Sequence, residues 1–408
     1  MVDLLDCTVM PYAWGSRTAI AELTGRATPS PGPEAELWMG AHPVAPSRLS
    51  RGCGPARELW RVIEEDAPRE LGADVVTSFG ARLPFLLKVL AAEQPLSLQA
   101  HPDEARAKVG YADEEARGVP RDAPARNYKD AAHKPELLCA LVPFEALCGF
   151  RRASDTLRLF DALAARELEV ALAPLRATPD ARGLAAVFGA LMTMPSGDAA
   201  RLVAATMEAC ERSPGGEFAR ERAWARRLHE LYPGDVGVIG ALLLNLVHLE
   251  PGEALFLGAG QLHAYLSGVG VELMASSDNV LRGGLTHKHV DPPELMRVLD
   301  FADGPVVPIS ARAVDAHERV WETPAREFRL SSIDLSGDER VDRDVRGPEI
   351  LLCTSAAIAI APAGGSAELV LPRGRAAFVP ASTVRYTLRA AASAHARASL
   401  YRATVNLT

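Results

Sequence analysis

The chain has 408 residues, of which 48% are hydrophobic and 24% charged, so it can bury a large core and is expected to divide into two or three domains. Its net charge of -8 means that the chain has no excess of basic residues to attract polyanions. Nucleic acids and anionic membranes are therefore poor candidate partners. No apolar run is long enough to span a membrane and no secretory leader opens the sequence, so we expect a cytoplasmic protein.

Six cysteines are spread widely through the chain, without the close CxxC pairs that are typical of structural zinc or redox sites. Disulfides are not expected in a reducing compartment, so these side chains are predicted to be buried free thiols. They are Cys7, Cys53, Cys139, Cys148, Cys210 and Cys353.

Short apolar runs broken by Pro and Gly dominate the first 150 residues. The runs at 83–90 and 137–142 are two examples. Bounded apolar runs of this length predict buried β-strands.

The spacing of the apolar residues changes in the block 153–243. They recur at i, i+3, i+4 and i+7, which predicts amphipathic helices. The residues that follow this spacing are Leu184, Val187, Phe188 and Leu191, and then Trp224, Leu228 and Leu231. Turn residues at 195–197 and 213–216 are expected to separate the helices.

Strand character returns after the helical block. Residues 246–249 and 254–257, joined by a Pro-Gly turn, predict a β-hairpin that delivers His263 at the end of a strand. From about residue 311 onward the chain is strand-like and carries no comparable set of His and Glu residues.

These patterns predict a mainly β protein with a helical insertion. Residues 1–152 and 244–310 are expected to form a β-sandwich or jelly-roll domain that binds metal. Residues 153–243 are the helical insertion, and 311–408 form a second β-sandwich without a metal site.

Metal-ligating residue types gather in three motifs of the predicted first domain. Gln99 and His101 are two residues apart, so on a strand both side chains point to the same face and could bind one ion. Glu136 opens an apolar run, where an unpaired carboxylate is costly, and His263 adds an imidazole far downstream. Each residue alone is more simply a satisfied polar side chain, but together they predict a catalytic metal site.

A downstream Gly-rich segment combines several charged side chains. Arg282 and Lys288 could bind a phosphate, the first through its bidentate fork and the second as a point charge. The simpler alternative for Arg282 is a surface ion pair with Asp278. His287 and His289 belong to a polar stretch that is expected to be a solvated loop, so they are not counted as ligands.

The chain resembles type I mannose-6-phosphate isomerase, a family of the cupin superfamily, in motifs that occur in the same order. The motifs are YAWGS (12–16), AELWMG (35–40), LSLQAHP (96–102), NYKD (127–130), HKPE (133–136) and the segment from HAY (263–265) to Asp291. The resemblance implies a cupin-type jelly-roll catalytic domain, a helical insertion and a second cupin-like β-sandwich. This is the architecture that the periodicity predicts.

The resemblance also implies roles for individual residues. It makes Gln99, His101, Glu136 and His263 the ligands of one Zn²⁺ per chain, and Arg282 a catalytic residue. It matches Glu272, Lys134, Ser97, Lys88 and Lys288 to polar positions that line the family's pocket. Of these we take Glu272 and Lys134, with His133, as catalytic candidates and Ser97, Lys88 and Lys288 as substrate-binding candidates. A carboxylate in a closed pocket can have its pKa raised toward neutrality, so Glu272 is a candidate base, with Lys134 and His133 as alternatives.

The sequence departs from the family pattern at two places. Ala131 and Ala132 stand where the family often has an Asn before HKPE, and His287 stands where a Pro is usual. Neither change removes a ligand. The first could alter how His133 and Glu136 are held, so metal affinity is the property it would affect.

The implied activity is the interconversion of D-mannose 6-phosphate and D-fructose 6-phosphate through an enediol or enediolate, which feeds mannose and GDP-mannose metabolism. The implied partner is a small sugar phosphate, with no nucleic acid and no membrane, and the oligomeric state stays open, a monomer included. Two alternatives remain: a non-catalytic metal-binding sensor of a sugar phosphate, and an isomerase of another aldose phosphate. An iron oxygenase would need a two-His-one-carboxylate set, against which Gln99 and the Arg282 and Lys288 pair argue.

Overall fold

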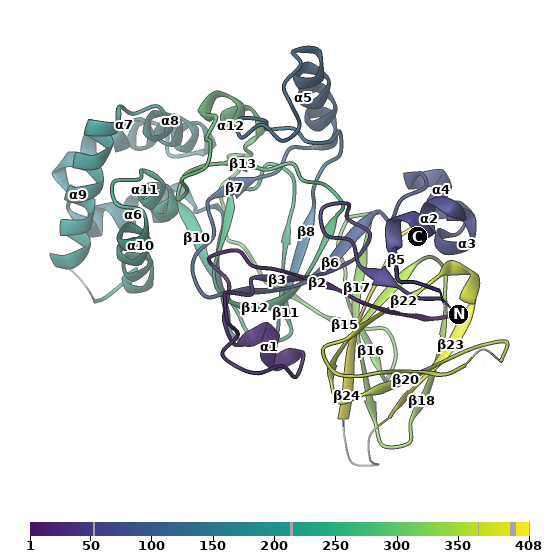
Figure 1. Ribbon diagram of the computed structural model, residues 1–408. Helices are drawn as coiled ribbons and strands as arrows, with labels where there is room; N and C mark the ends of the chain where they lie inside the picture. The colour runs from purple at the N-terminus through teal and green to yellow at the C-terminus, as the bar shows by residue number, and fades with distance from the viewer. Residues whose placement is uncertain (52–53, 213–214, 366, 392–396, 408) are drawn as a thin grey trace.

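Figure 1 shows three parts of the chain: a central β domain, a group of helices beside it at the upper left, and a second β domain at the lower right. The computed structural model describes residues 1–51, 54–212, 215–365, 367–391 and 397–407. The mainly β fold with a helical insertion is therefore confirmed. Within the described residues, no helix is long and apolar enough to cross a membrane.

The cysteines within the described residues are free thiols, and four of the five are buried. Burial raises the pKa of these four, to about 12 for Cys139 and Cys148 and to about 11 for Cys210 and Cys353. They are thus inert apolar side chains in the core. Cys53 lies outside the described residues.

The central domain is a jelly roll of eleven connected strands. They are β2 (Thr8–Met10), β3 (Glu36–Met39), β6 (Phe85–Ala92), β7 (Gln99–Ala100), β8 (Glu136–Ala140), β9 (Phe144–Phe150), β10 (Leu244–Leu249), β11 (Glu253–Leu257), β12 (His263–Ala275), β13 (Leu281–Arg282) and β14 (Ile309–Ser310). The long strand β12 joins the two halves, because its first part pairs with β9 and its second part with β6 and β8. At the bend, Gly268 has a φ of 126°, and an added Cβ would lie 2.5 Å from the Phe144 ring, so only glycine fits.

The strands β10 and β11 follow each other in the chain, but they do not pair with each other in the described structure. β10 pairs with β9, and β11 pairs with β8 and β14. The hairpin predicted for 246–257 is therefore wrong, and His263 is the first residue of its strand. The polar Pro251-Gly252 turn carries the chain from one half of the jelly roll to the other. A turn of this composition fits either connection, so the sequence does not distinguish them.

Helices that the apolar runs did not predict lie between the strands of this domain. They are α1 (Ala19–Leu23), α2 (Leu59–Glu65), α3 (Ala67–Leu71), α4 (Ala73–Phe79), α5 (Glu104–Ala116) and α12 (Pro292–Val298), and the short strands β4 (Arg48–Leu49) and β5 (Arg57–Glu58) pair beside them. Most have five to seven residues, too few for a helical period to stand out in the sequence.

The insertion consists of helices whose core is continuous with the adjacent end of the jelly roll, where Leu98, Leu147 and Leu262 join the same cluster. Its elements are α6 (Ala153–Leu163), the 3₁₀ turn η1 (Arg166–Leu168), α7 (Glu169–Ala177), α8 (Ala181–Met192), α9 (Ser196–Arg212), α10 (Ala219–Leu231) and α11 (Gly237–Leu242). Helix α8 begins where the Asp180 side chain accepts hydrogen bonds from the backbone N–H groups of Arg182 and Gly183. It buries the four apolar residues whose spacing predicted it.

The C-terminal domain is a sandwich of two sheets, ordered β1-β22-β19-β24-β17-β16-β15 and β18-β23-β20-β21. Its elements are β1 (Asp3–Leu5), β15 (Arg312–Ala313), β16 (Glu318–Trp321), β17 (Arg329–Ser336), β18 (Arg340–Asp344), β19 (Glu349–Ser355), β20 (Ile358–Pro362), β21 (Leu369–Leu371), β22 (Ala376–Val379), the turn η2 (Ala381–Thr383), β23 (Arg385–Ala390) and β24 (Arg397–Thr404). The first strand of the chain pairs with β22, so residues 3–5 belong to this sheet and not to the jelly roll.

The alternation of side chains along the strands separates two cores. In β6, Leu87 and Val89 point outward and pack with Ile350 and Leu352 of the C-terminal domain. Leu90, the residue after Val89, belongs instead to the interior of the jelly roll, and the intervening Lys88 points to the same side. One face of the sheet is thus sealed by the second domain, while the other face is free to carry polar groups.

Candidate metal centre and active site

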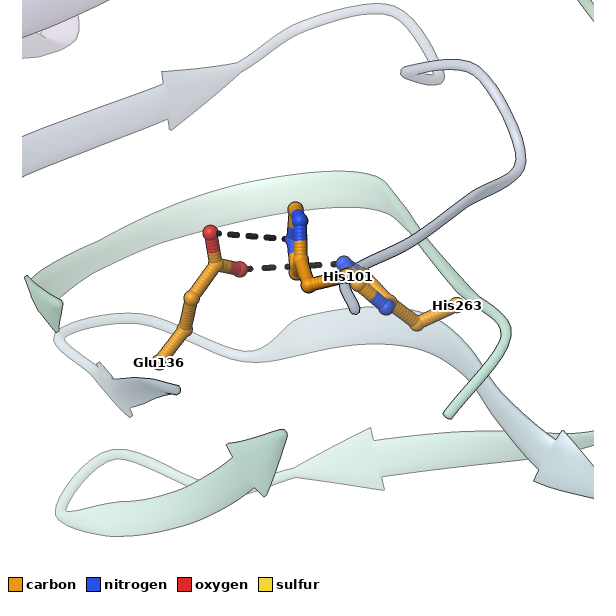
Figure 2. Close-up of side chains that lie close together, drawn as sticks. All are labelled: His101, Glu136 and His263. Atoms are coloured by element: carbon orange, nitrogen blue, oxygen red, sulfur yellow. Dashed lines mark ion pairs between the residues drawn. The ribbon is translucent and has the colours of Figure 1, made fainter. Parts of the chain in front are cut away.

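Three of the predicted ligands converge in the interior of the jelly roll (Figure 2). His101 follows β7, Glu136 is the first residue of β8, and His263 is the first residue of β12. Their nitrogen and oxygen atoms all lie within 4.8 Å of one another. His101 Nε2 is 3.2 Å from Glu136 Oε1, and His263 Nε2 is 3.7 Å from Glu136 Oε2.

Each imidazole is oriented by a backbone carbonyl. His101 Nδ1 donates to the Asn279 carbonyl at 2.7 Å, and His263 Nδ1 donates to the Gln261 carbonyl at 2.8 Å. Both Nε2 atoms therefore carry free lone pairs that point at the carboxylate. Burial lowers the pKa of His101, and burial together with the His101 ring lowers the pKa of His263 to about 4. Both rings are neutral at pH 7, as ligation requires.

The polar atoms of this group fit a metal ion. His101 Nε2, His263 Nε2 and Glu136 Oε2 are buried and lack hydrogen-bond partners. Buried polar atoms are rarely left unsatisfied, so three together indicate a shared missing partner. Two ligands about 2.1 Å from a tetrahedral metal are roughly 3.4 Å apart, which is close to the separations seen here. The group therefore suits a divalent cation.

Gln99 lies beside this group by strand register. It is paired directly with His263 of β12 on one side and with Arg282 of β13 on the other. Directly paired residues of antiparallel strands project from the same face, so the three side chains stand in one row. Within the described residues the Gln99 amide makes no side-chain hydrogen bond, so its oxygen is available as a fourth ligand.

The Lys134 ammonium is the charge closest to the carboxylate ligand. Its Nζ lies 2.9 Å from Glu136 Oε1. Burial alone would raise the pKa of Glu136, but Lys134 and the His101 ring hold it well below its ordinary value. Glu136 is therefore an anion, as a metal ligand must be.

A second charged group occupies the neighbouring cross-strand row. Lys88 of β6 is paired with Glu272 of β12, and its Nζ lies 3.0 Å from Glu272 Oε2 and 3.5 Å from Glu36 Oε1. Burial raises the pKa of Glu272 although Lys88 opposes the shift. Burial would lower the pKa of Lys88, but Glu272 and Glu36 raise it above its ordinary value. This places a carboxyl group of raised proton affinity near the metal group.

Arg282 and Lys288 line a cavity of about 450 Å³ together with Lys129. Burial lowers the pKa of Arg282, and burial with the neighbouring Arg282 and Lys129 charges lowers the pKa of Lys288. Arg126 also lines the cavity but is paired with Glu115, so Lys129, Arg282 and Lys288 are three cations against the two carboxylates Asp122 and Asp278, a balance that favours an anionic ligand. Ser97 is half-buried just before β7. The backbone N–H of the next residue, Leu98, donates to the carbonyl of Gly284, which belongs to the same segment as Arg282 and Lys288.

The surface ion pair considered for Arg282 does not form, because Asp278 lies 3.3 Å from His42 Nε2 and, in the part of the chain that is described, Arg282 has no ion-pair partner. The side chains of His287 and His289 are exposed, as expected for a solvated loop.

His133 contacts the second domain rather than the metal group. Its Nε2 lies 2.7 Å from Glu327 Oε1, in the segment that leads to β17. The bond to Glu327 raises the pKa of His133, so the protonated form is favoured. His133 therefore connects the central domain to the C-terminal domain, directly before Lys134 in the chain.

Asn279 and Asp130 hold the loop 129–133 in place. This loop contains Ala131 and Ala132, where the sequence departs from the family pattern. The Asn279 amide donates to the carbonyls of Asp130 and Ala132, and its oxygen accepts from the Lys129 N–H. The backbone carbonyl of the same residue orients His101, so Asn279 links the loop, through its side chain, to a candidate ligand, through its main chain. Sequence reasoning missed this role because it depends on a contact between segments about 150 residues apart; the only signal was an Asn inside a dense polar segment.

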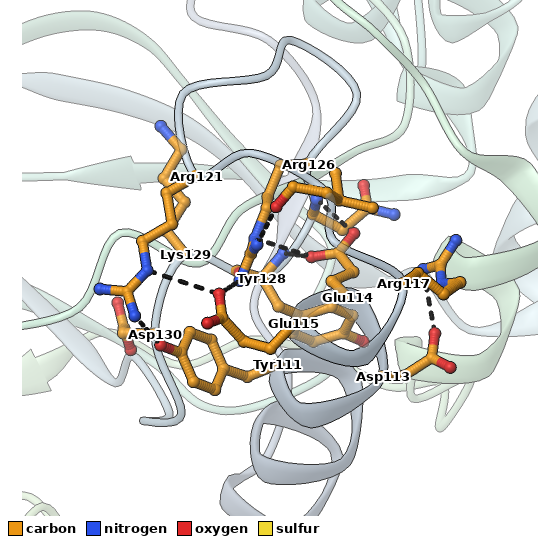
Figure 3. A network of polar contacts seen from close by, with 12 residues as sticks. Tyr111, Asp113, Glu114, Glu115, Arg117, Arg121, Arg126, Tyr128, Lys129 and Asp130 are labelled. Carbon is orange, nitrogen blue, oxygen red and sulfur yellow. Dashed lines mark hydrogen bonds and ion pairs between the residues drawn. The ribbon is translucent and has the colours of Figure 1, made fainter.

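Helix α5 fixes the segment that enters this loop (Figure 3). Glu114 accepts hydrogen bonds from the Asn127 and Tyr128 backbone N–H groups at 3.0 and 2.8 Å, and Arg126 bonds to Glu115 at 2.6 Å. Tyr128 packs on the helix at Gly110, where an added Cβ would lie 2.3 Å from the ring. The loop with Lys129 is thereby attached to a rigid element.

Comparisons with known proteins are consistent along the whole chain. Residues 2–153 match the family model described as phosphomannose isomerase type I, catalytic domain, and residues 161–244 match the helical insertion domain of the same family. The mannose-6-phosphate isomerase of Escherichia coli (strain K12) is 41% identical over 94% of this chain and 95% of its own length, and that of Bos taurus is 31% identical over 93% of both.

Solved structures agree with the sequence comparisons. A zinc-bound mannose 6-phosphate isomerase superposes with a TM-score of 0.90 at 39% identity, and a phosphomannose isomerase variant from Salmonella typhimurium does so with 0.91 at 38%. Each covers 100% of this chain and of its own.

Proposed function

The chain belongs to the type I phosphomannose isomerase family and is an enzyme of that family, and on this premise we propose that it interconverts D-mannose 6-phosphate and D-fructose 6-phosphate with one zinc ion bound. The observation that carries the proposal is the buried His101, Glu136 and His263 group beside the Lys88 and Glu272 pair. The family assignment supports placing the reaction in mannose and GDP-mannose metabolism.

His101, Glu136 and His263, with Gln99 as the fourth ligand, would hold the zinc ion. A bound zinc ion supplies Lewis-acid polarisation of the substrate oxygens. Two neutral imidazoles, one amide and one carboxylate leave the site a net positive charge once a divalent ion is bound. The donor set thus favours the negative charge that develops on oxygen when a carbon-bound proton is removed.

The isomerisation moves a proton from C2 to C1 through an enediol or enediolate, while O2 loses its hydroxyl proton to become the ketone oxygen and the former aldehyde oxygen O1 gains one. Glu272 is our candidate for the base that takes the C2 proton and returns it to C1. Burial raises its pKa above the ordinary carboxyl value, which supports the role because a carboxylate of raised pKa is a stronger base. Lys88, 3.0 Å away, would stabilise the carboxylate between the two transfers. Lys134 is the second candidate, since its ammonium lies at the metal group.

The cavity with Lys129, Arg282 and Lys288 is our candidate for the phosphate end of the substrate. Register places Arg282 in one row with Gln99 and His263, so its guanidinium can act on oxygen charge at the metal side as well. Ser97, in the segment next to this row, could add a hydroxyl contact to the phosphate.

A non-catalytic sensor would keep the metal group and lose the proton-transfer residues. Glu272, Lys134 and Arg282 are all present, which favours the enzyme. Isomerisation of another aldose phosphate differs only in pocket shape.

The test is a coupled assay with D-mannose 6-phosphate and D-glucose 6-phosphate as alternative substrates. Formation of fructose 6-phosphate from the mannose ester, at a kcat/KM at least roughly a hundredfold above that of the glucose ester, is expected. Metal binding without turnover of either ester would point to the sensor.

A further inference from the structure

A cavity of about 510 Å³ opens between the jelly roll and the C-terminal domain, away from the metal group. On the jelly-roll side, Leu141, Val142 and Val269 line it, where β8 ends and β12 bends. On the other side its wall is the larger sheet of the C-terminal domain. None of the metal ligands and none of the candidate catalytic residues takes part in it.

The sheet face that forms this wall is apolar in one cross-strand row and polar in the next. One cross-strand row is apolar and consists of Trp321, Leu330 and Ala403. The row two residues further along β16 is Arg319, Ser332 and Tyr401, and it projects from the same face. The apolar row seals the contact with the jelly roll, whereas the polar row opens into the cavity. A contact that only held two domains together would not need an arginine and a serine there.

Two arginines of the cavity have exposed guanidinium groups, and the carboxylates of the lining are Glu22, which forms no ion pair within the described residues, and Asp334, which is paired with Arg397. The two arginines are Arg319 of β16 and Arg373, just before β22. Among the residues that the structure describes, neither makes an ion pair or a side-chain hydrogen bond. By contrast, Arg343 and Arg402 of the same domain are both paired with Glu318. Free guanidinium groups at a cavity favour a phosphate, which they bind through two parallel hydrogen bonds.

The rest of the lining suits a polyhydroxylated ligand. Ser332 and Thr354 supply hydroxyl groups, and Glu22 of α1 supplies a carboxylate that can accept from sugar hydroxyls. Trp321 and Tyr401 are stacked, with ring centroids 5.8 Å apart and an angle of 12° between their planes. Only the edges of these rings reach the cavity, since Trp321 is 2% and Tyr401 8% exposed, and they form its apolar floor. A few convergent polar groups around an apolar wall are typical of a small-molecule site.

We propose that this interdomain cavity is a second binding site, specific for a phosphorylated sugar, with Arg319 and Arg373 as the phosphate contacts. The site is independent of the isomerase reaction, because it shares no residue with the metal group or its cationic cavity. The proposal also gives the C-terminal domain a function, because the reaction at the metal group does not use the residues of its sheet.

The test is titration calorimetry on the zinc-loaded protein with glucitol 6-phosphate, which has no carbonyl group and cannot be isomerised. The native chain is expected to show one binding event more per chain than the double variant Arg319→Gln/Arg373→Gln, whose affinity at the second site falls by at least roughly tenfold. Arg346→Gln is the matched control, since Arg346 is exposed in the same domain outside the cavity. An equal number of binding events per chain in the native protein and in the double variant would contradict the proposal of a second site.

Two further titrations separate a sugar phosphate from a simple anion. Glucitol without phosphate is expected not to bind, and inorganic phosphate is expected to bind at least roughly tenfold more weakly than glucitol 6-phosphate. Inorganic phosphate that binds the second site as tightly as the sugar ester would overturn the assignment to a phosphorylated sugar. Because both readouts are binding events at residues outside the metal group, their failure would leave the isomerase activity measurable and unaffected.

Discussion

Lys88 and Glu272 face each other across β6 and β12, with Nζ and Oε2 3.0 Å apart, in a row next to the proposed metal ligand Glu136. A buried ion pair costs desolvation that its own attraction only partly offsets, so it is weak evidence for a purely stabilising role. Placed beside a metal group, the same pair is suited to proton transfer.

The carboxylate of this pair is tested by Glu272→Gln. The variant should keep its fold and its zinc, because Glu272 is not a ligand, and kcat should fall by roughly 10²–10⁴. Exchange of solvent deuterium into the substrate carbon should be lost, as measured by proton NMR. Glu250→Gln, which changes an exposed carboxylate of the same domain, is the control. Continued exchange in the Glu272 variant would move the proton transfer to Lys134.

Arg282→Ala should lower kcat more than it lowers the zinc content. A donor aimed at transition-state charge is worth roughly 10²–10³ in rate, and Arg282 stands in the row of Gln99 and His263 without being a ligand. Steady-state kinetics with metal analysis of the same sample checks this. Lys288→Ala, at the exposed side of the cavity, should mainly raise KM. A change of KM alone in the arginine variant would limit its role to phosphate binding.

The ligand assignment is tested by His263→Ala. This variant should lose stoichiometric zinc and activity together, because the ring is fully buried and its Nε2 has no other partner. His289→Ala, at an exposed histidine of the loop after β13, should retain both. Metal analysis after dialysis gives the answer, and one equivalent of zinc in the His263 variant would remove that residue from the ligand set.

That His101, Glu136 and His263 form a group that could hold a metal could be predicted from the sequence, because short motifs and the family resemblance both pointed to these residues, whereas Gln99 as a fourth ligand stays a prediction. Gln99 and His101 lie two residues apart, and Glu136 opens an apolar strand, so each pattern carries its own geometry. Long-range relations were not predictable in this way. The pairing of β10 with β9, the contact of His133 with Glu327 and the link from Asn279 to His101 each depend on which distant segments meet. Local periodicity contains no information on that choice.

Asn279→Ala tests such a long-range relation. The substitution removes the bonds to Asp130 and Ala132, so the loop and the backbone carbonyl that orients His101 lose their support. Zinc affinity should fall by roughly 10- to 100-fold, while the fold is kept. Competition with a metal indicator measures this. Asn127→Ala, whose amide bonds to Asp291, is the control, and equal affinities in the two variants would contradict the role.

The contact of His133 with Glu327 predicts a pH-dependent stability. Since Glu327 raises the pKa of His133, the protonated ring contributes stability that is fully present below its unfolded pKa and is lost as the pH rises through the folded pKa. Glu327→Gln should therefore lower the Tm more at pH 6 than at pH 9. Glu322→Gln is the control, because it pairs with Arg312, and arginine is a side-chain type that stays charged at both pH values. An equal effect of Glu327→Gln at both pH values would show that the pair does not form in solution.

The central claim is most directly tested by the conversion of D-mannose 6-phosphate to D-fructose 6-phosphate by the purified protein, before chelation, after chelation and after zinc is added back. The account predicts turnover that disappears with the metal and returns with zinc. Turnover that survives complete removal of the metal, or its absence in protein that holds one zinc per chain, would contradict it.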